Sequence, residues 1–335
     1  MRHARRFFVL SLLLLAAACV GTTPAALVDG GPQKLAFRVI AQPFKLDDAD
    51  ARQIDRLIWR GGISLTANSP HFGGWSDLRV TADGRHLTSI SDVGRWLTAT
   101  IDYDKAGNLS GVSDGRIGPL LGLDGKPLPG KEWADAEGLA RLPDGAWLVS
   151  FERHHRIWRY PTLDGVPTEV TGPSDIGKQP DNGGIETITA LANGRVIAIS
   201  EQYQVRPGFA AGWIGEPEGD GRYRWERFEY AKIPHFDPSS MTQLPDGSFV
   251  VLERAFDFFR GLRVRVMHVA ADAIRPGATV HAEQLARLVT PYIVDNLEGV
   301  SAATGPRGET LLWMISDDNF NPLQRTLLLM FELAK

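Results

Sequence analysis

One pattern recurs five times along this chain and constrains the fold more than any other feature. It is a short apolar run, a turn, and a second apolar run. The turns are Asp83-Gly84, Asp144-Gly145, Asn193-Gly194, Asp246-Gly247 and Pro306-Arg307-Gly308. Apolar runs joined by Asp-Gly or Asn-Gly predict tight β-hairpins. The five units start at Asp77, Glu137, Glu186, Ser239 and Glu298, so they recur every 49 to 60 residues. Hairpins at such a period predict an all-β fold, a β-propeller in which each unit is one four-stranded blade.

The termini bear on how the ring of blades closes. The last unit has one further apolar run, 325–333, where a four-stranded blade needs two. Propeller rings usually close by borrowing a strand from the other end of the chain, and either 35–43 or 57–66 could supply it. We therefore expect five blades closed by an N-terminal strand. A sixth, degenerate blade between residues 35 and 75 is the alternative.

Composition agrees with a turn-rich globular domain. The 335 residues include 35 Gly and 21 Pro, and helix patterns are confined to 47–57 and to either 271–275 or 283–287. Residues 263–269 and 284–289 also suit the two outer strands of the fourth unit. The net charge of −4 argues against a nucleic-acid partner, which usually requires a basic face. The single cysteine excludes a disulfide framework and a cysteine-based zinc site.

The N-terminus has the pattern of an export signal. Three arginines, at positions 2, 5 and 6, precede twelve mostly apolar residues, 7–18. Twelve residues are too few to span a bilayer as a helix, and a basic start followed by an apolar run is typical of a signal peptide. We expect 1–18 to be that signal, 19–34 a tether and 35–335 the propeller. The segment Arg5-Arg6-Phe7-Phe8 also resembles a twin-arginine motif, so the export route stays open.

Cys19 follows three alanines, and this junction resembles a bacterial lipobox. We expect lipidation of Cys19 and a periplasmic location, with the lipid anchor as the only membrane contact. Val20, in place of an aspartate, is compatible with sorting to the outer membrane. The alternative is an ordinary secretory peptide cut near Ala18.

Acidic residues recur at two positions of the hairpin units. In a propeller, the start of the innermost strand and the end of the second strand lie on the same face of the ring. The first position holds Asp77, Glu137, Glu186 and Glu298, and the second holds Asp92, Glu152, Glu201, Glu253 and Asp317. Carboxylates this close repel one another unless a cation or protonation compensates. Oxygen ligands from several strands favour calcium or magnesium. We expect a divalent cation, Ca²⁺, bound by members of the set Asp77, Glu137, Glu186, Glu201, Glu298 and Asp317.

Arginines accompany this acidic rim. Arg153 and Arg254 each follow a second-strand glutamate, and Arg325 lies just beyond Asp317. Guanidinium groups suit phosphate and carboxylate oxygens, so we expect these three to bind anions. A cation with arginines at one mouth is what a phosphoester-handling site requires. In the alternative, structural interpretation, each Glu accepts backbone N–H groups between blades and the following Gly allows close packing.

No catalytic residue can be named from motifs. The chain lacks HExxH, a P-loop and GxGxxG. Residues 111–115 match GxSxG, but a nucleophile elbow needs a helix after the serine, and the surroundings here are turn and strand.

Several segments resemble one family. They are 135–140 (Asp-Ala-Glu-Gly-Leu-Ala), 182–186 (Asn-Gly-Gly-Ile-Glu), the C-terminal stretch 316–329, and the opening stretch 61–74. Over residues 57–333 the chain is similar to the phytase-like, "esterase-like activity of phytase" family of exported bacterial proteins. The resemblance implies a β-propeller and hydrolysis of phosphate or carboxylate esters with calcium, and it supplies no catalytic residues.

Two functions from different classes follow. One is a cation-dependent esterase or phosphoesterase that acts on a small-molecule ester or another anionic ligand. The other is a non-catalytic envelope propeller that binds a ligand or a protein partner. Turnover of a generic ester that requires the cation would distinguish them.

Overall fold

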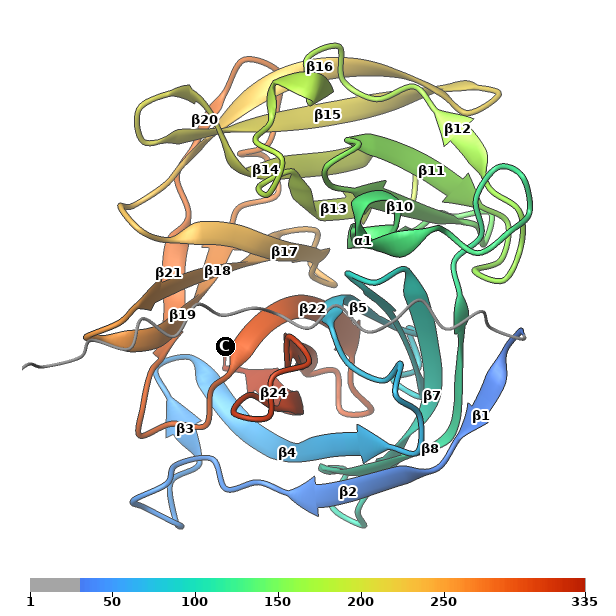
Figure 1. Cartoon of the computed structure of the whole chain (residues 1–335). Coiled ribbons are helices and arrows are strands. Elements are labelled where there is room, and N and C mark those ends of the chain that lie inside the picture. The colour runs from blue at the N-terminus through green and yellow to red at the C-terminus, as the bar shows by residue number, and fades with distance from the viewer. Residues whose placement is uncertain (1–30, 335) are drawn as a thin grey trace, which may run out of the picture.

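The computed structural model describes residues 31–334, and these form a five-bladed β-propeller (Figure 1). The innermost strands β5, β9, β13, β17 and β22 surround the axis. The predicted propeller is confirmed, with five blades. The expected signal peptide, most of the tether and Cys19 lie outside the described residues.

Each blade is a mainly antiparallel sheet with its innermost strand named first. Blade 1 contains β5 (Trp75–Val80), β6 (His86–Ser91), β7 (Arg95–Tyr103), β8 (Leu109–Pro119) and the edge strand β1 (Gln33–Leu35). Blade 2 contains β9 (Ala136–Arg141), β10 (Trp147–Phe151), β11 (Arg156–Tyr160) and β12 (Thr168–Val170). Blade 3 contains β13 (Ile185–Ala190), β14 (Val196–Arg206), β15 (Phe209–Gly219), β16 (Arg222–Ala231) and β20 (Thr279–Val280). Blade 4 contains β17 (Asp237–Gln243), β18 (Phe249–Asp257), β19 (Gly261–Val269) and β21 (Glu283–Leu288). Blade 5 contains β22 (Asn296–Thr304), β23 (Thr310–Asp317), β24 (Thr326–Leu333), β4 (Leu57–Ala67) and β2 (Phe37–Ala41), and β3 (Gln53–Ile54) pairs with β4.

The N-terminal strand β4 closes the ring. It pairs antiparallel with the C-terminal strand β24, from Leu65 opposite Thr326 to Leu57 opposite Leu333. In Figure 1 the blue strands β2 and β4 therefore lie in the same blade as the red strand β24. Residues 37–67 belong to blade 5, so the alternative of a sixth blade there is wrong. Gln33 and Lys34, expected in the tether, belong to β1 at the edge of blade 1.

None of the three stretches with a helix pattern forms a helix. Residues 47–57 form turns and the short strand β3, 271–275 form turns, and 283–287 lie in strand β21. Pairing of β21 with β19 outweighs local helix propensity there. Within residues 31–334 the helices are α1 (Gly130–Ala134) and a 3₁₀ turn, Ile176–Lys178.

The apolar core is divided into five layers, each between two neighbouring blades. Trp75, Trp213 and Trp313 are fully buried in these layers. Packing between blades therefore provides most of the buried apolar surface, which stabilises the ring as one unit.

Arg79 of β5 lies on the axis and binds the innermost strands of other blades. Its guanidinium donates to the carbonyl oxygens of Ile188 (2.6 Å), Val300 (3.0 Å) and Met241 (3.2 Å). These acceptors come from blades 3, 5 and 4. The side chain is buried, so it both joins the blades and fills the channel.

Asp77 completes this axial network. Its carboxylate lies 3.1 Å from the Arg79 guanidinium and accepts the Leu139 N–H of blade 2 and the Ser240 hydroxyl of blade 4, both at 2.8 Å. Burial raises the pKa of Asp77 to about 6, against the opposing effect of Arg79. Together Asp77 and Arg79 contact all four of the other blades.

Candidate functional site

A β-bulge interrupts each innermost strand at the same place. In blade 2, Ala136 pairs with Phe151 and Gly138 pairs with Ser150, so Glu137 between them has no partner in the ladder. A bulge re-aims the side chain of the extra residue. The register shifts in the other blades leave out the equivalent residue, which defines the bulge positions Ser76, Glu137, Glu186, Ser239 and Glu298.

This register corrects the expectation for Asp77. The sequence repeat aligns Asp77 with Glu137, but Trp75 pairs with Ser91 and Asp77 pairs with Ile90, so the bulge residue of blade 1 is Ser76. Asp77 instead points into the axial network, where protein donors satisfy its carboxylate. It does not line the acidic pocket, and we leave it out of the proposed ligand set.

A second ring of side chains stands beside the bulges. In each second strand it is the residue that follows the ladder partner of the residue just before the bulge. These strand-end positions are Asp92, Glu152, Glu201, Arg254 and Asp317. Blade 4 thus places Arg254 where the other blades place an acid. Glu253, expected at the rim, is buried between blades and accepts hydrogen bonds from Tyr230 and Arg265, both at 2.8 Å.

The two rings enclose a cavity of about 330 Å³ at one mouth of the channel. Eight carboxylates line it, against the two cations Lys131 and Arg254. The carboxylates are Asp92, Asp135, Glu137, Glu152, Glu186, Glu201, Glu298 and Asp317. If all were ionised, the pocket would hold a formal charge of about −6, so it strongly favours a bound cation.

Carboxylate oxygens of Glu137, Glu186 and Glu298 lie within 4.8 Å of one another. Three blades supply these three side chains from their bulges. Two overlapping groups meet the same limit, Asp135 with Glu137 and Glu152, and Glu152 with Glu186 and Glu201. Of the other expected ligands, Glu201 therefore belongs to one group. Asp317 lines the cavity but accepts the Asn319 N–H at 2.6 Å.

Burial and mutual repulsion make these carboxyl groups hard to ionise. Burial is the largest cause, and it raises the pKa values of Glu152 and Glu298 to about 7 each. The pKa values of Glu137 and Glu186 are also raised well above their usual range, because neighbouring carboxylates add to the effect of burial. The pocket therefore retains protons near neutral pH unless another positive charge replaces them.

Three buried carboxylate oxygens of the pocket have no hydrogen-bond partner: Oδ1 of Asp92, Oδ1 of Asp135 and Oε2 of Glu186. Of these three residues, Glu186 belongs to the cluster of bulge glutamates from three blades. Oε2 of Glu186 has no hydrogen-bond partner, although the residue is only 5% exposed. Its Oε1 has only a long contact, 3.4 Å, with Arg254. A buried polar atom without a partner is costly, and a cation beside it would remove that cost.

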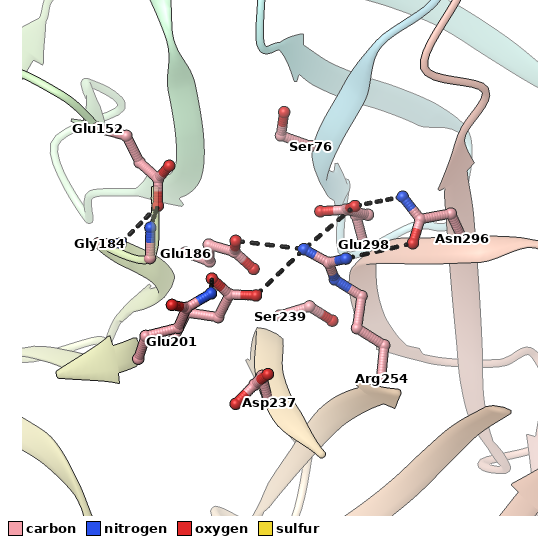
Figure 2. Close-up of polar contacts among 12 residues, drawn as sticks. Ser76, Glu152, Gly184, Glu186, Glu201, Asp237, Ser239, Arg254, Asn296 and Glu298 are labelled. Atoms are coloured by element: carbon pink, nitrogen blue, oxygen red, sulfur yellow. Dashed lines mark hydrogen bonds and ion pairs between the residues drawn. The ribbon is translucent and has the colours of Figure 1, made fainter. Parts of the chain in front are cut away.

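Arg254 lies among three carboxylates, as Figure 2 shows. Its Nη2 is 3.2 Å from Glu201, 3.4 Å from Glu186 and 3.6 Å from Glu298. Nη1 is 3.4 Å from Oδ1 of Asn296. Of the three expected anion-binding arginines, Arg254 alone lines the cavity.

Arg153 and Arg325 are engaged at its periphery. Nε of Arg153 is 2.6 Å from Asp135, and Nε of Arg325 is 3.3 Å from Asp295. Both side chains are partly exposed, and neither lines the cavity. The geometry therefore does not bring the three arginines together on one ligand.

Sequence reasoning missed seven residues of the lining: Ser76, Lys131, Asp135, Asn182, Gln202, Asn296 and Asn319. Asp135 and Asn296 each stand two places before a bulge glutamate, so a repeated position held the signal for both. Lys131 comes from α1, an insertion outside the repeat, and it contacts Asp92 and Asp135. No repeat-based argument could have found that lysine.

The structural alternative also holds in part. Glu152 accepts the backbone N–H groups of Gly183 (2.7 Å) and Gly184 in the next blade. A Cβ on Gly138 would lie 2.8 Å from the Glu186 carbonyl oxygen, so this glycine permits close packing between blades. The Glu-Gly dipeptide therefore supplies a carboxylate to the pocket and a glycine that allows the blades to pack closely.

Fold and pocket together define the class: a five-bladed β-propeller with an acidic cavity at one mouth of its channel. The sequence profile of the phytase-like family, "esterase-like activity of phytase", matches residues 70–320. The chain belongs to this family. No curated protein matches it.

Several solved structures are similar to the chain at low identity. An α-L-arabinofuranosidase from Podospora anserina is 12% identical, with a TM-score of 0.47 over 86% of this chain and 95% of that one. The Cps50 (Swd1) β-propeller domain from Myceliophthora thermophila is 8% identical, with a TM-score of 0.40 over 89% and 98%. The PQQ-bound aldose sugar dehydrogenase from Streptomyces coelicolor is 13% identical, with a TM-score of 0.38 over 89% and 98%. Among residues 31–334, no helix is long and apolar enough to cross a membrane.

Proposed function

We propose that this protein is a hydrolase of phosphate or carboxylate esters that requires a divalent cation, Ca²⁺, in the acidic pocket. One observation carries the proposal. Glu137, Glu186 and Glu298 converge from three blades, and a buried oxygen of Glu186 has no protein partner.

The donor set fits a hard cation. The three side chains offer only carboxylate oxygens, which calcium and magnesium prefer, and they offer no nitrogen or sulfur ligand suited to zinc. When bound, such a cation would offset the negative charge that builds on the oxygens of an ester during hydrolysis.

Other pocket residues would position the ester. Arg254 supplies the guanidinium closest to the carboxylate cluster, and Lys131, Asn182 and Asn296 line the same cavity with further N–H donors. These groups would bind the anionic or polar part of a substrate. At about 330 Å³ the cavity is at the lower end of the range for small-molecule sites, so it would accept a small ester or the head of a larger one.

A non-catalytic binding function is the second candidate, and one observation favours it. The residues that line the cavity include no histidine or cysteine, and Ser76 is their only hydroxyl. The lining therefore lacks the Ser–His or Cys–His pair by which many esterases activate a nucleophile. In this case the propeller would bind a cation, a ligand or a protein partner without turnover.

The test combines metal analysis of the purified protein with a panel of chromogenic phosphate and carboxylate esters. Turnover should require Ca²⁺, should stop with chelator and should fall at least about tenfold in Glu186→Gln. The matched control is Glu169→Gln, an exposed glutamate of β12 that lies outside the pocket. Calcium binding without turnover of any ester would support the binding function. Turnover unaffected by chelator would overturn the proposal.

For location, we propose export to the periplasm and attachment to the outer membrane through acylated Cys19. The lipobox-like junction supports this. Two or more acyl chains suffice for stable anchoring, since each buried CH₂ contributes about 0.8 kcal/mol. Cys19→Ser should release the protein from membranes after a salt wash, and a variant that stays with the membranes would rule out lipid anchoring.

A further inference from the structure

Blade 4 differs from the other blades at the pocket. Its bulge residue is Ser239 where three blades have glutamate, and its strand-end residue is Arg254 where four blades have an acid. The propeller thus places a positive charge of its own inside an otherwise acidic ring. Arg254 is the positive side chain that contacts Glu186 and Glu298, two of the three proposed cation ligands.

We propose that Arg254 and the bound cation compete for Glu186 and Glu298, so that cation binding frees the Arg254 guanidinium to hold the anionic group of the substrate. This inference rests on the proposed function. It adds that the cation controls when the arginine is available.

Arg254 is attracted by three carboxylates, but its contacts with them are long. One terminal nitrogen, Nη2, is shared among three carboxylates at 3.2 to 3.6 Å, and no carboxylate makes a two-pronged pair with the guanidinium. Strong Arg–carboxylate pairs use two parallel hydrogen bonds at about 2.7–2.9 Å. In addition, the buried Nε of Arg254 has no partner. The guanidinium balances charge here without its hydrogen bonds being satisfied.

Electrostatic repulsion explains why the divalent cation and the Arg254 guanidinium exclude each other from Glu186 and Glu298. A divalent ion among Glu137, Glu186 and Glu298 would share oxygens with a guanidinium that is 3.4 Å from Glu186 and 3.6 Å from Glu298. Two positive charges at such separations repel strongly in a buried site. The guanidinium would then leave Glu186 and Glu298, and the anionic group of a substrate in the cavity would become its new partner. Lys131 has less of this conflict, because its ion pairs are with Asp92 and Asp135 and not with Glu186 or Glu298.

This competition couples the binding of the divalent cation to the binding of the anion. An anion that binds the freed arginine makes cation binding tighter, and the cation increases anion affinity by the same factor, because such coupling is reciprocal. Without the cation, Arg254 stays with its three carboxylates and anion affinity is low.

The experiment measures Ca²⁺ affinity by calorimetry in the wild type, Arg254→Met, Arg254→Gln and Lys131→Met, with melting curves to verify folding. Both Arg254 variants should bind Ca²⁺ about tenfold more tightly than the wild type. Lys131→Met removes one positive charge from the same pocket without touching Glu186 or Glu298, so it is the matched control for net charge. The Ca²⁺ affinity of Lys131→Met should change much less than that of the Arg254 variants.

A second titration uses inorganic phosphate as the anion. Ca²⁺ should raise phosphate affinity in the wild type, and this increase should shrink about tenfold in both Arg254 variants. Unchanged or weaker Ca²⁺ affinity in the Arg254 variants would overturn the inference, as would an equal gain in Lys131→Met. Failure of every protein to bind Ca²⁺ would instead overturn the proposed function.

Discussion

At the scale of single residues, a shift of one position decides what an acidic side chain does. Glu137 occupies a bulge and faces the pocket, whereas Asp77 stands one residue past the bulge of its blade and faces the axis. Both are buried. Glu137 is surrounded by other carboxylates, whereas Asp77 is beside Arg79 and accepts backbone and hydroxyl hydrogen bonds. The first arrangement suits a bound cation, and the second suits a permanent structural role.

The axial arginine should be essential for stability. Arg79→Met removes the donor to three blades and leaves Asp77 as an uncompensated buried charge, so we expect a loss of about 3–5 kcal/mol in the free energy of unfolding. Urea unfolding measures this loss. The control is Arg85→Met, an exposed arginine in the turn after the same strand, with an expected change of about 0.5 kcal/mol or less. An Arg79→Met protein as stable as the wild type would show that the network does not hold the blades.

The sequence predicts most, but not all, of the pocket. The repeated Glu-Gly dipeptide indicates Glu137 and Glu298, and the repeat alignment adds Glu186. Asp77 and Glu253 are misplaced by one residue when the units are aligned by their acidic residues. Counted from the turn, each bulge of blades 1 to 4 stands seven residues before the Asp or Asn, which gives Ser76 and not Asp77. The same count, seven residues after the turn glycine, leads to Glu152, Glu201 and Arg254, but the contacts of Arg254 with three carboxylates depend on how the blades converge.

At the scale of strands, the innermost strands fit together through glycine. A Cβ on Gly138 would lie 2.5 Å from the Ser150 hydroxyl, 2.7 Å from Ile188 and 2.8 Å from the Glu186 carbonyl oxygen. On Gly299 it would lie 2.6 Å from the Leu78 nitrogen. The residue after each of these bulge glutamates must therefore be small, because the next blade occupies the space.

Enlarging Gly138 should disturb both packing and the pocket. Gly138→Ala forces blade 3 away at the residue that carries the Glu186 carboxylate, so we expect about 1–3 kcal/mol of destabilisation and weaker Ca²⁺ binding. Urea unfolding and calcium titration measure the two effects. As control, Gly177→Ala adds a methyl group where no atom lies within 4 Å. If Gly138→Ala behaved like this control in both measurements, the close approach of blades 2 and 3 would contribute neither to stability nor to Ca²⁺ binding.

Strand prediction succeeded for the hairpins of the repeat and for the strand that closes the ring. The closing strand expected at 57–66 is β4, because its apolar residues match the last blade. Residues 283–287 could be read as a short helix, and 284–289 as an outer strand of the fourth unit. The strand is confirmed as β21, because pairing with β19 decides the conformation.

At the scale of the whole molecule, the pocket concentrates negative charge in a chain whose net charge is only −4. The five apolar layers between blades hold eight carboxylates together at one mouth. Blade packing therefore opposes the repulsion in the pocket, and bound protons or a bound cation relieve it.

Stability without a cation should fall as pH rises. The pKa values of Glu152 and Glu298 are raised from 4.5 to about 7 in the folded protein. Between these values the folded state binds more protons than the unfolded state, so the free energy of unfolding decreases with pH. In chelator we expect the melting temperature at pH 7.5 to be at least about 2 °C below that at pH 5.5. A higher melting temperature at pH 7.5 would contradict the sign of these pKa shifts.

The most direct test of the cation site is thermal melting at pH 7.5 in Ca²⁺ and in chelator, for wild type, Glu186→Gln and Glu169→Gln. A cation that binds only the folded protein stabilises it by about 2.7 kcal/mol at one hundred times its dissociation constant. We predict a higher melting temperature in Ca²⁺ for wild type and Glu169→Gln, and a much smaller rise for Glu186→Gln. No effect of Ca²⁺ on the wild type, or an equal rise in Glu186→Gln, would contradict a cation site built on the bulge glutamates.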